Sequence, residues 1–238
     1  MNNKKNYWIG GYHAVQKAIE NKERKVLKLI LNSEHKNREI FFHNTEVKNN
    51  KFFNKIFDNE DFAHQGYAAQ IENLDQHNCD IKNYNKNIEN FIALDGVIDP
   101  RNIGSIIRNC VAFSFFNIII NKKEFNEKSA AMYKAASGAM EKINLYPCSN
   151  IINPINLLKK NGYQIIGLDG NANKDIANHK WDKKNVIIFG SESRGMRNII
   201  KDNCDEFIKI EINPYIDSLN VSNASAALLM YLKYTLKI

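Results

Sequence analysis

Polar and charged residues that could cap a helix or bind a ligand follow three separate apolar segments of this sequence. The first group lies in IDPRNIGSIIRNC, where Asn102 and Arg108 stand six residues apart with Gly104 between them. If Asn102 is the N-cap of a helix, Arg108 projects less than two turns further along that helix. Taken alone, this segment is better explained by a capped helix with a solvated arginine than by a ligand site.

The second group follows NVIIFG, in the run SESRGMRN. It contains Glu192, Arg194 and Arg197 and is bounded by Gly190 and Gly195. A glycine-bounded turn between a strand and a helix exposes backbone N–H groups, and such turns often hold anions or the polar groups of a cofactor. A polar turn without any ligand remains the alternative.

The third group is the string SLNVSNA, which stands just ahead of an almost wholly apolar helix. Capping of that helix would explain Ser222. The whole string, with Ser218, Asn220 and Asn223, offers more hydrogen-bonding groups than one helix end requires. It therefore predicts ligand contacts in addition to a cap, and the apolar helix itself is expected to be buried on more than one side.

Alternating strands and helices are predicted to position these three groups. The predicted strands are 91–97, 116–121, 163–170, 185–190 and 207–212, and the predicted helices are 102–112, 127–140, 154–161 and 222–236. Such alternation predicts an α/β fold with a mostly parallel sheet that is covered on both faces. Ligands of such sheets collect beyond the carboxyl ends of the strands, which is where all three groups stand.

The N-terminal part of the chain reads as a smaller α/β domain. A helix is predicted over 7–20, a strand over 25–32, a polar helix-prone stretch up to Asn59, and a second strand at AAQI, after His64. We expect His64 to be structural and not catalytic. The polar segment DQHNCDIKNYNKNIEN is the best linker, so the predicted division is 1–75, linker 76–90, and 91–238.

Composition narrows the classes of protein that remain. The 238 residues carry a net charge of +7, which suggests an anionic partner, most often nucleic acid. We find no membrane-length apolar run, no signal peptide and no Cys-x-x-Cys pair, and this favours a cytoplasmic protein with reduced thiols. The six histidines lack metal-ligand spacing, so no metal site is expected. Dinucleotide-binding, P-loop and nucleophile-elbow motifs are also missing.

Taken together, the three groups resemble one family. DPRNIGSIIRNC, IIFGSESRGM and SLNVSNASAALL, in this order, resemble motifs 1, 2 and 3 of the SpoU (TrmH-type, SPOUT superfamily) RNA ribose 2′-O-methyltransferases, over residues 91–238. GYHAVQKAIE and HQGYAAQI also look like the family's ribosomal L30e-like substrate-binding domain. That arrangement is similar to the RlmB-type enzymes, which methylate a guanosine of 23S rRNA. The resemblance implies a C-terminal trefoil-knot domain and a homodimer with its active site close to the subunit interface.

The resemblance also implies a cofactor and residue roles. S-adenosylmethionine would be held in the knot by Leu168, Gly170, Gly190, Ile210 and Leu219. The matched catalytic positions are Asn102, Arg108, Glu192, Ser218 and Asn220. The expected RNA contacts are Arg101, Arg194 and Arg197. Lys22, Arg24 and Lys25 are expected to be solvated surface charges and only secondarily RNA contacts.

Several alternatives stay open at this point. The substrate is expected to be 23S rRNA, with tRNA or another rRNA position as the alternative. A non-catalytic RNA-binding assembly factor is disfavoured because Asn102, Arg108, Glu192 and Asn220 are all intact. Arg108 is either the proton acceptor, assisted by a substrate phosphate, or a cationic anchor for that phosphate, because arginine is essentially always charged.

Overall fold

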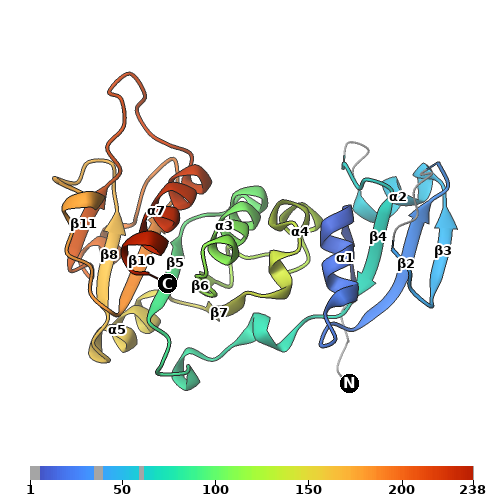
Figure 1. Ribbon diagram of the computed structural model, residues 1–238, viewed down its shortest axis with the longest axis horizontal. Helices are drawn as coiled ribbons and strands as arrows, with labels where there is room; N and C mark the ends of the chain where they lie inside the picture. The colour runs from blue at the N-terminus through green and yellow to red at the C-terminus, as the bar shows by residue number, and fades with distance from the viewer. Residues whose placement is uncertain (1–5, 35–39, 59–61, 238) are drawn as a thin grey trace.

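Two β-sheets organise the chain in the computed structural model, which describes residues 6–34, 40–58 and 62–237 (Figure 1). The larger sheet is parallel throughout and has the order β7-β6-β5-β10-β8-β11-β9. Its strands are β5 (Asn90–Asp95), β6 (Asn117–Asn121), β7 (Asn144–Cys148), β8 (Gln164–Leu168), β9 (Lys174–Asp175), β10 (Asn185–Gly190) and β11 (Glu206–Lys209). The predicted parallel sheet is therefore confirmed.

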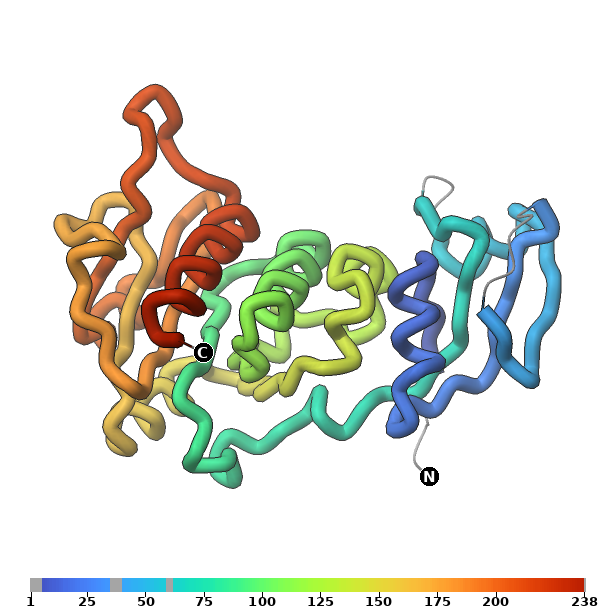
Figure 2. The backbone as a smooth tube through the Cα atoms, in the orientation of Figure 1, coloured from blue at the N-terminus to red at the C-terminus, as the bar shows by residue number. Residues whose placement is uncertain are grey.

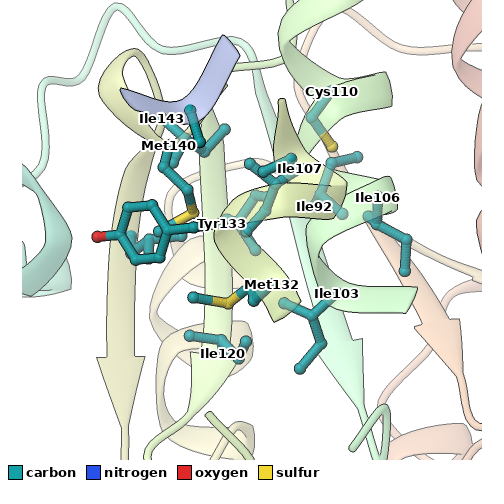
Figure 3. Packing of buried hydrophobic residues seen from close by; sticks show 14 of the residues in the cluster. Ile92, Ile103, Ile106, Ile107, Cys110, Ile120, Met132, Tyr133, Met140 and Ile143 are labelled. Carbon is teal, nitrogen blue, oxygen red and sulfur yellow. The ribbon is translucent and has the colours of Figure 1, made fainter. Parts of the chain in front are cut away.

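Helices cover both faces of the larger sheet, as predicted. They are α3 (Pro100–Ala112), α4 (Ala130–Ala136), α5 (Ile152–Lys160), the short α6 (Asn198–Lys201) and α7 (Val221–Thr235). Alternate residues of one strand serve opposite faces: Ile92 belongs to the core under α3, α4 and α7, whereas Phe91 belongs to the core under α5. Figure 3 shows the first core, where Ile103 and Ile107 of α3 meet Met132 of α4.

Gly104, in the first polar group, has a packing role. A Cβ atom at this position would lie 2.3 Å from the carbonyl oxygen of Met132 and 2.9 Å from the Cβ of Ala135. Only glycine therefore lets α3 and α4 approach this closely. The contact fixes the helix that carries Asn102 and Arg108 against the rest of the core.

Two strands of the larger sheet escaped the sequence analysis. β9 is only two residues long, and β7 contains Pro147. Proline is tolerated in β7 because this strand lies at the edge of the sheet. The helix predicted over 127–140 is shorter, because Ser137 and Gly138 have positive φ angles and end α4. A 3₁₀ turn, η3 (Ala139–Glu141), follows.

The smaller sheet has four strands in the order β1-β4-β2-β3 and lies at the other end of the molecule (Figure 1). Its elements are β1 (Tyr7–Gly10), α1 (Tyr12–Glu20), β2 (Val26–Asn32), β3 (Thr45–Lys48), α2 (Asn50–Phe57) and β4 (Tyr67–Ile71). Residues 35–39 and 59 of the predicted helix-prone stretch lie outside the described residues.

The helix predicted over 7–20 is wrong in its first part. Residues 7–10 form β1, which pairs antiparallel with β4. Gly11 has a φ of 99°, which turns the chain before α1 begins at Tyr12. The aromatic and β-branched residues YWI favour a strand once β4 offers a partner. His64 is a structural residue: its Nδ1 accepts a hydrogen bond from the backbone of Gly66, and its ring stacks on Phe53.

The segment predicted as a linker packs against the larger sheet along most of its length. Figure 2 shows it running from the smaller sheet toward the start of β5. It contains two 3₁₀ turns, η1 (Asp75–Asn78) and η2 (Ile81–Asn83), and the N–H of Cys79 donates to the carbonyl oxygen of Leu145 (2.9 Å). Ile81, Tyr84 and Ile88 reach the core under α5, so widely spaced apolar residues suffice to dock a polar segment.

Burial lowers the pKa of His77, within this segment, to about 4. Its Nε2 donates to the carbonyl oxygen of Met140 (2.7 Å), a bond that the neutral and the protonated ring can both make, so burial and not this bond favours the neutral ring. The unfolded chain binds a proton near pH 6.5, so stability is lost as the pH falls from about 6.5 to about 4. We therefore expect the free energy of unfolding to be about 2 kcal/mol lower at pH 5 than at pH 7 because of His77.

Urea unfolding at those two pH values measures this loss. His77→Gln keeps a donor for Met140 and cannot titrate, so the difference between the two pH values should shrink by that amount. An equal difference in wild type and variant would contradict the prediction.

A buried polar network joins the two sheets. The guanidinium of Arg24 lies against the carboxylate of Glu141, with Nε–Oε2 and Nη2–Oε1 distances of 2.9 Å. Beside this ion pair, the hydroxyls of Tyr7 in β1 and Tyr133 in α4 are 2.6 Å apart. The expectation that Arg24 is a solvated surface charge is therefore wrong, because an ion-pair partner more than a hundred residues away keeps it in the interior.

No helix within the described residues is both long and apolar enough to cross a bilayer.

Candidate active site

A cavity of about 430 Å³ opens where the chain leaves the carboxyl ends of β8 and β10 and follows β11. The five positions expected to hold a cofactor all line it: Leu168, Gly170, Gly190, Ile210 and Leu219. Loops that are far apart in the sequence thus form one wall, because parallel strands end at the same edge of the sheet.

Glu192 connects the three polar groups at the cavity. Its Oε1 accepts hydrogen bonds from Asn102 Nδ2 (3.2 Å), from the N–H of Val221 (3.2 Å) and from Asn220 Nδ2. Asn220 Nδ2 also lies 3.1 Å from Asn102 Oδ1. One carboxylate oxygen therefore ties the first turn of α3 and the start of α7 to the turn after β10.

The helix caps differ from those predicted. Asp99, not Asn102, caps α3, since its Oδ1 accepts from the N–H of Arg101 (2.9 Å). Asn220, not Ser222, caps α7, since its Oδ1 accepts from the N–H of Ser222 (2.9 Å). The amide of Asn102 is consequently available to Glu192. Asn220 does both tasks, with its oxygen on the helix and its nitrogen on the carboxylate.

The turn after β10 is closed by its own backbone. Ser191 and Gly195 exchange two hydrogen bonds, with N–O distances of 3.2 and 2.9 Å. A Cβ atom at Gly190 would lie 2.5 Å from the backbone nitrogen of Met196, and Gly195 has a φ of 63°. The two glycines therefore make the tight turn possible, and they leave Glu192 and Arg194 facing the cavity.

The expected catalytic residues are not all gathered at this point. Ser218 lines the cavity, but Arg108 does not. Arg108 is exposed and forms no hydrogen bond with the residues that the structure describes. Six helical residues correspond to a rotation of about 240°, so Asn102 and Arg108 point in different directions from α3. Within one chain, the structure does not bring Arg108 to the cluster around Glu192.

The three arginines expected to contact RNA differ in their surroundings. Arg101 is exposed beside Asn102, and Arg194 is exposed at the cavity. Arg197 is half-exposed, but it forms an ion pair with the buried carboxylate of Asp95, with an Nη2–Oδ1 distance of 2.5 Å. Arg197 therefore has a partner inside the protein, whereas the other two arginines are exposed at the surface.

Two acidic residues at strand ends were missed by the sequence analysis. Asp95 ends β5, and Asp169 follows β8 and lies 2.7 Å from Lys201 at the cavity wall. Burial opposes ionisation of Asp169, but the hydrogen bonds from Lys201 and from the N–H of Asn171 outweigh it, so the pKa of Asp169 is lowered. A carboxylate directly after an apolar strand was the signal that could have revealed both.

The wall of the cavity combines apolar and polar surface. Phe189, Ile212 and Val221 offer apolar surface, whereas the loops around Asp169 and Asp217 offer carboxylates. At Gly170 a Cβ atom would meet no atom within 4 Å, so backbone there faces open space. Such a site can seat a flat apolar ring and bind polar or cationic groups at its edge.

Comparison with known proteins gives a consistent result. Residues 89–231 match the SpoU rRNA Methylase family. A protein of Staphylococcus saprophyticus assigned to the TrmH family of tRNA/rRNA methyltransferases is 31% identical over 233 residues, which cover 94% of this chain and 93% of the relative.

Two solved structures share the fold. An RNA 2′-O ribose methyltransferase superposes with a TM-score of 0.81 at 15% identity, over 99% of this chain and 90% of the other. The SpoU methyltransferase AviRb of Streptomyces viridochromogenes, in complex with AdoMet, gives a TM-score of 0.78 at 16% identity, over 98% and 91% of the two chains.

Proposed function

The chain belongs to the SpoU rRNA methylase family, and from this premise we propose that it transfers a methyl group from S-adenosylmethionine to the 2′-oxygen of a ribose in 23S rRNA, on a guanosine as in RlmB-type enzymes. The observation that carries the proposal is the junction at Glu192, where the three motif segments meet beside the cavity.

The residues of the cavity suit S-adenosylmethionine (AdoMet). The apolar side chains of Leu168, Ile210 and Leu219 would seat the adenine ring. Gly170 and Gly190 would let the cofactor approach the backbone, and the wall carboxylates suit its positive charges. When bound, S-adenosylmethionine supplies a methyl group that its sulfonium charge has already activated.

The remaining work falls to the chain's own side chains. They have to align the ribose hydroxyl with the methyl group and help that hydroxyl lose its proton. Alignment alone can contribute about 7–11 kcal/mol. The three donors on Glu192 hold its carboxylate in place, so we assign it the task of fixing the active-site loops, with Ser218 at the cavity wall beside the reacting groups.

Arg108 would act on the substrate from outside the Glu192 cluster, either as the proton acceptor or as the anchor of a phosphate. Its exposure and its position away from the cluster support a site completed by a second subunit. α7 also supports a homodimer. Two of its side chains, Leu228 and Leu232, are buried in the core, whereas Met230 and Tyr234 of the same helix are 48% and 75% exposed. A helix that is apolar nearly all round normally has a second covering surface.

The proposal includes the domain organisation. Residues 1–75 would be an L30e-like RNA-binding domain, 76–90 its connection, and 91–238 a knotted catalytic domain. The four-stranded mixed sheet supports the first domain. The path of the chain after β11 supports the knot. The chain passes through the loop that lines the cavity and then forms α7, which packs on α3. The net charge of +7 and the exposed Arg101 and Arg194 support RNA as the substrate. The proposed location of this activity is the cytoplasm.

The test is a methylation assay on protein-free RNA. Purified chain is incubated with methyl-labelled S-adenosylmethionine and, separately, with 23S rRNA, 16S rRNA or bulk tRNA, and the labelled nucleotide is mapped by primer extension. We expect label in 23S rRNA only, lost in Glu192→Ala and retained in Lys159→Met, which alters an ion pair with Asp205 outside the cavity.

Other outcomes would correct specific parts of the proposal. Label in tRNA or in 16S rRNA would keep the chemistry and overturn the substrate. Absence of label in every RNA, together with no binding of S-adenosylmethionine, would overturn the proposed activity and favour an RNA-binding assembly factor.

A further inference from the structure

We propose that Asp95 and Arg197 form a pair of positioning residues that holds the turn Ser191–Gly195 in the shape needed for cofactor binding. This inference rests on the proposed function, since it assumes that the cavity takes S-adenosylmethionine. It gives Arg197 a role inside the protein in place of the expected contact with RNA.

The surroundings of Asp95 provide the first step of the argument. Asp95 is the last residue of β5, aligned with Gly190 of β10 in the parallel ladder, and it is 0% exposed. Its Oδ2 accepts a hydrogen bond from the backbone N–H of Arg197 (2.8 Å), and its Oδ1 accepts from Arg197 Nε (2.7 Å). A fully buried carboxylate thus has both main-chain and side-chain donors from one residue, which satisfies the charge.

The second step concerns the two ends of the turn. Gly190 is held by the ladder between β10 and β5, and Arg197 is held by the carboxylate at the end of the same strand. Between them, Met196 is buried and Ser191 bonds to Gly195. Both ends of the turn are therefore fixed to β5, and the turn places Glu192 and Arg194 at the cavity wall.

The third step separates this role from RNA binding. Nε and Nη2 of Arg197 both contact Oδ1 of Asp95, at 2.7 and 2.5 Å, and this contact also raises the pKa of Arg197 although burial opposes the rise. An RNA phosphate would have to compete with an ion pair already formed at 2.5 Å. Asp95, which has no exposed surface, cannot touch RNA at all, so a shared effect of both residues would have to pass through the turn.

The experiment compares Asp95→Asn, Arg197→Gln and the double variant. Isothermal titration calorimetry gives the dissociation constant of S-adenosylmethionine without RNA, and steady-state kinetics give the KM for RNA. We expect each single variant to weaken cofactor binding about tenfold and the double variant to weaken it little further, because the side-chain ion pair between the two residues is lost in all three. The KM for RNA should stay within about twofold of wild type. Lys159→Met is the matched control, since it removes an ion pair whose two residues do not line the cavity.

A second readout does not depend on the cofactor. Hydrogen exchange of the backbone amides of Gly195 and Arg197 should be faster in both single variants, because the turn loses the side-chain part of its attachment to β5 in each of them, and in Asp95→Asn the charged acceptor of the Arg197 N–H as well. Arg197→Gln also keeps the inference testable if Asp95→Asn does not fold.

Three results would overturn the inference. One is a raised KM for RNA in Arg197→Gln with unchanged cofactor binding, which would return Arg197 to RNA contact. Another is unchanged cofactor binding in a folded Asp95→Asn, and the third is unchanged amide exchange in both variants. Failure of the proposed function would look different, because wild type itself would then not bind S-adenosylmethionine.

Discussion

Glu141→Ala is expected to lower the free energy of unfolding by about 3–5 kcal/mol, the cost of leaving one partner of a buried ion pair uncompensated. The side chain of Arg24 is 0% exposed and that of Glu141 is 4% exposed, so water cannot replace the lost carboxylate. Arg24 Nη1 would keep its bond to the carbonyl oxygen of Glu72 (2.7 Å), but Nε would lose its acceptor and Nη2 would retain only the long contact with the hydroxyl of Tyr133 (3.5 Å).

Urea unfolding followed by circular dichroism measures this effect. The control is Glu20→Ala, which removes an exposed ion pair with Lys17 and should leave the unfolding midpoint unchanged. The double variant Arg24→Met/Glu141→Leu should be more stable than Glu141→Ala, because an apolar pair leaves no charge in the interior. A Glu141→Ala variant as stable as wild type would show that water reaches Arg24.

Arg108→Lys is expected to reduce turnover at least about a hundredfold while the protein remains folded and binds its cofactor normally. Lysine keeps the positive charge but loses the planar pair of donors that fits a phosphate or a developing alkoxide. Arg108 lies outside the cavity and, in the described part of the chain, has no hydrogen-bond partner, so neither stability nor cofactor affinity should change.

Three measurements on one preparation check this prediction: single-turnover rate, dissociation constant of S-adenosylmethionine and thermal midpoint. The control is Lys160→Gln, an exposed cation in the last turn of α5. Near-normal turnover in Arg108→Lys would exclude both the proton acceptor and the phosphate anchor. A lowered thermal midpoint in Arg108→Lys would show that Arg108 has a structural role, which its exposed position does not suggest.

The parallel sheet could be predicted from the amino-acid sequence alone, and so could the edge of the sheet at which the three motifs meet. Continuous apolar runs such as FIALD and NVIIFG form buried parallel strands, and the polar groups stand directly after them. Because all carboxyl ends of a parallel sheet lie on one edge, local patterns predicted that the three polar groups gather there. The choice of Gly190 and Leu219 as cofactor positions came from the family resemblance, and both residues line the cavity.

The residues at which helices and strands begin were harder to predict from the sequence. Asp99 and Asn102 are both good N-caps within one turn, as are Asn220 and Ser222. Pro100, a residue type favoured at the first helical position, was the signal for Asp99, whereas no such signal separates Asn220 from Ser222. The structure decided through the second partner: Glu192 engages Asn102 and leaves Asp99 to cap α3. The strand at residues 7–10 likewise formed because β4 lies beside it.

The pairing of distant charges depends on how the elements pack together. Asp95 pairs with Arg197 over 102 residues, and Arg24 pairs with Glu141 over 117 residues. Periodicity reports which face of an element is apolar, but it carries no information about which distant side chain lies opposite. A buried charge is tolerated only where its partner arrives from another part of the fold, so these pairs are a property of the packed chain and not of any segment.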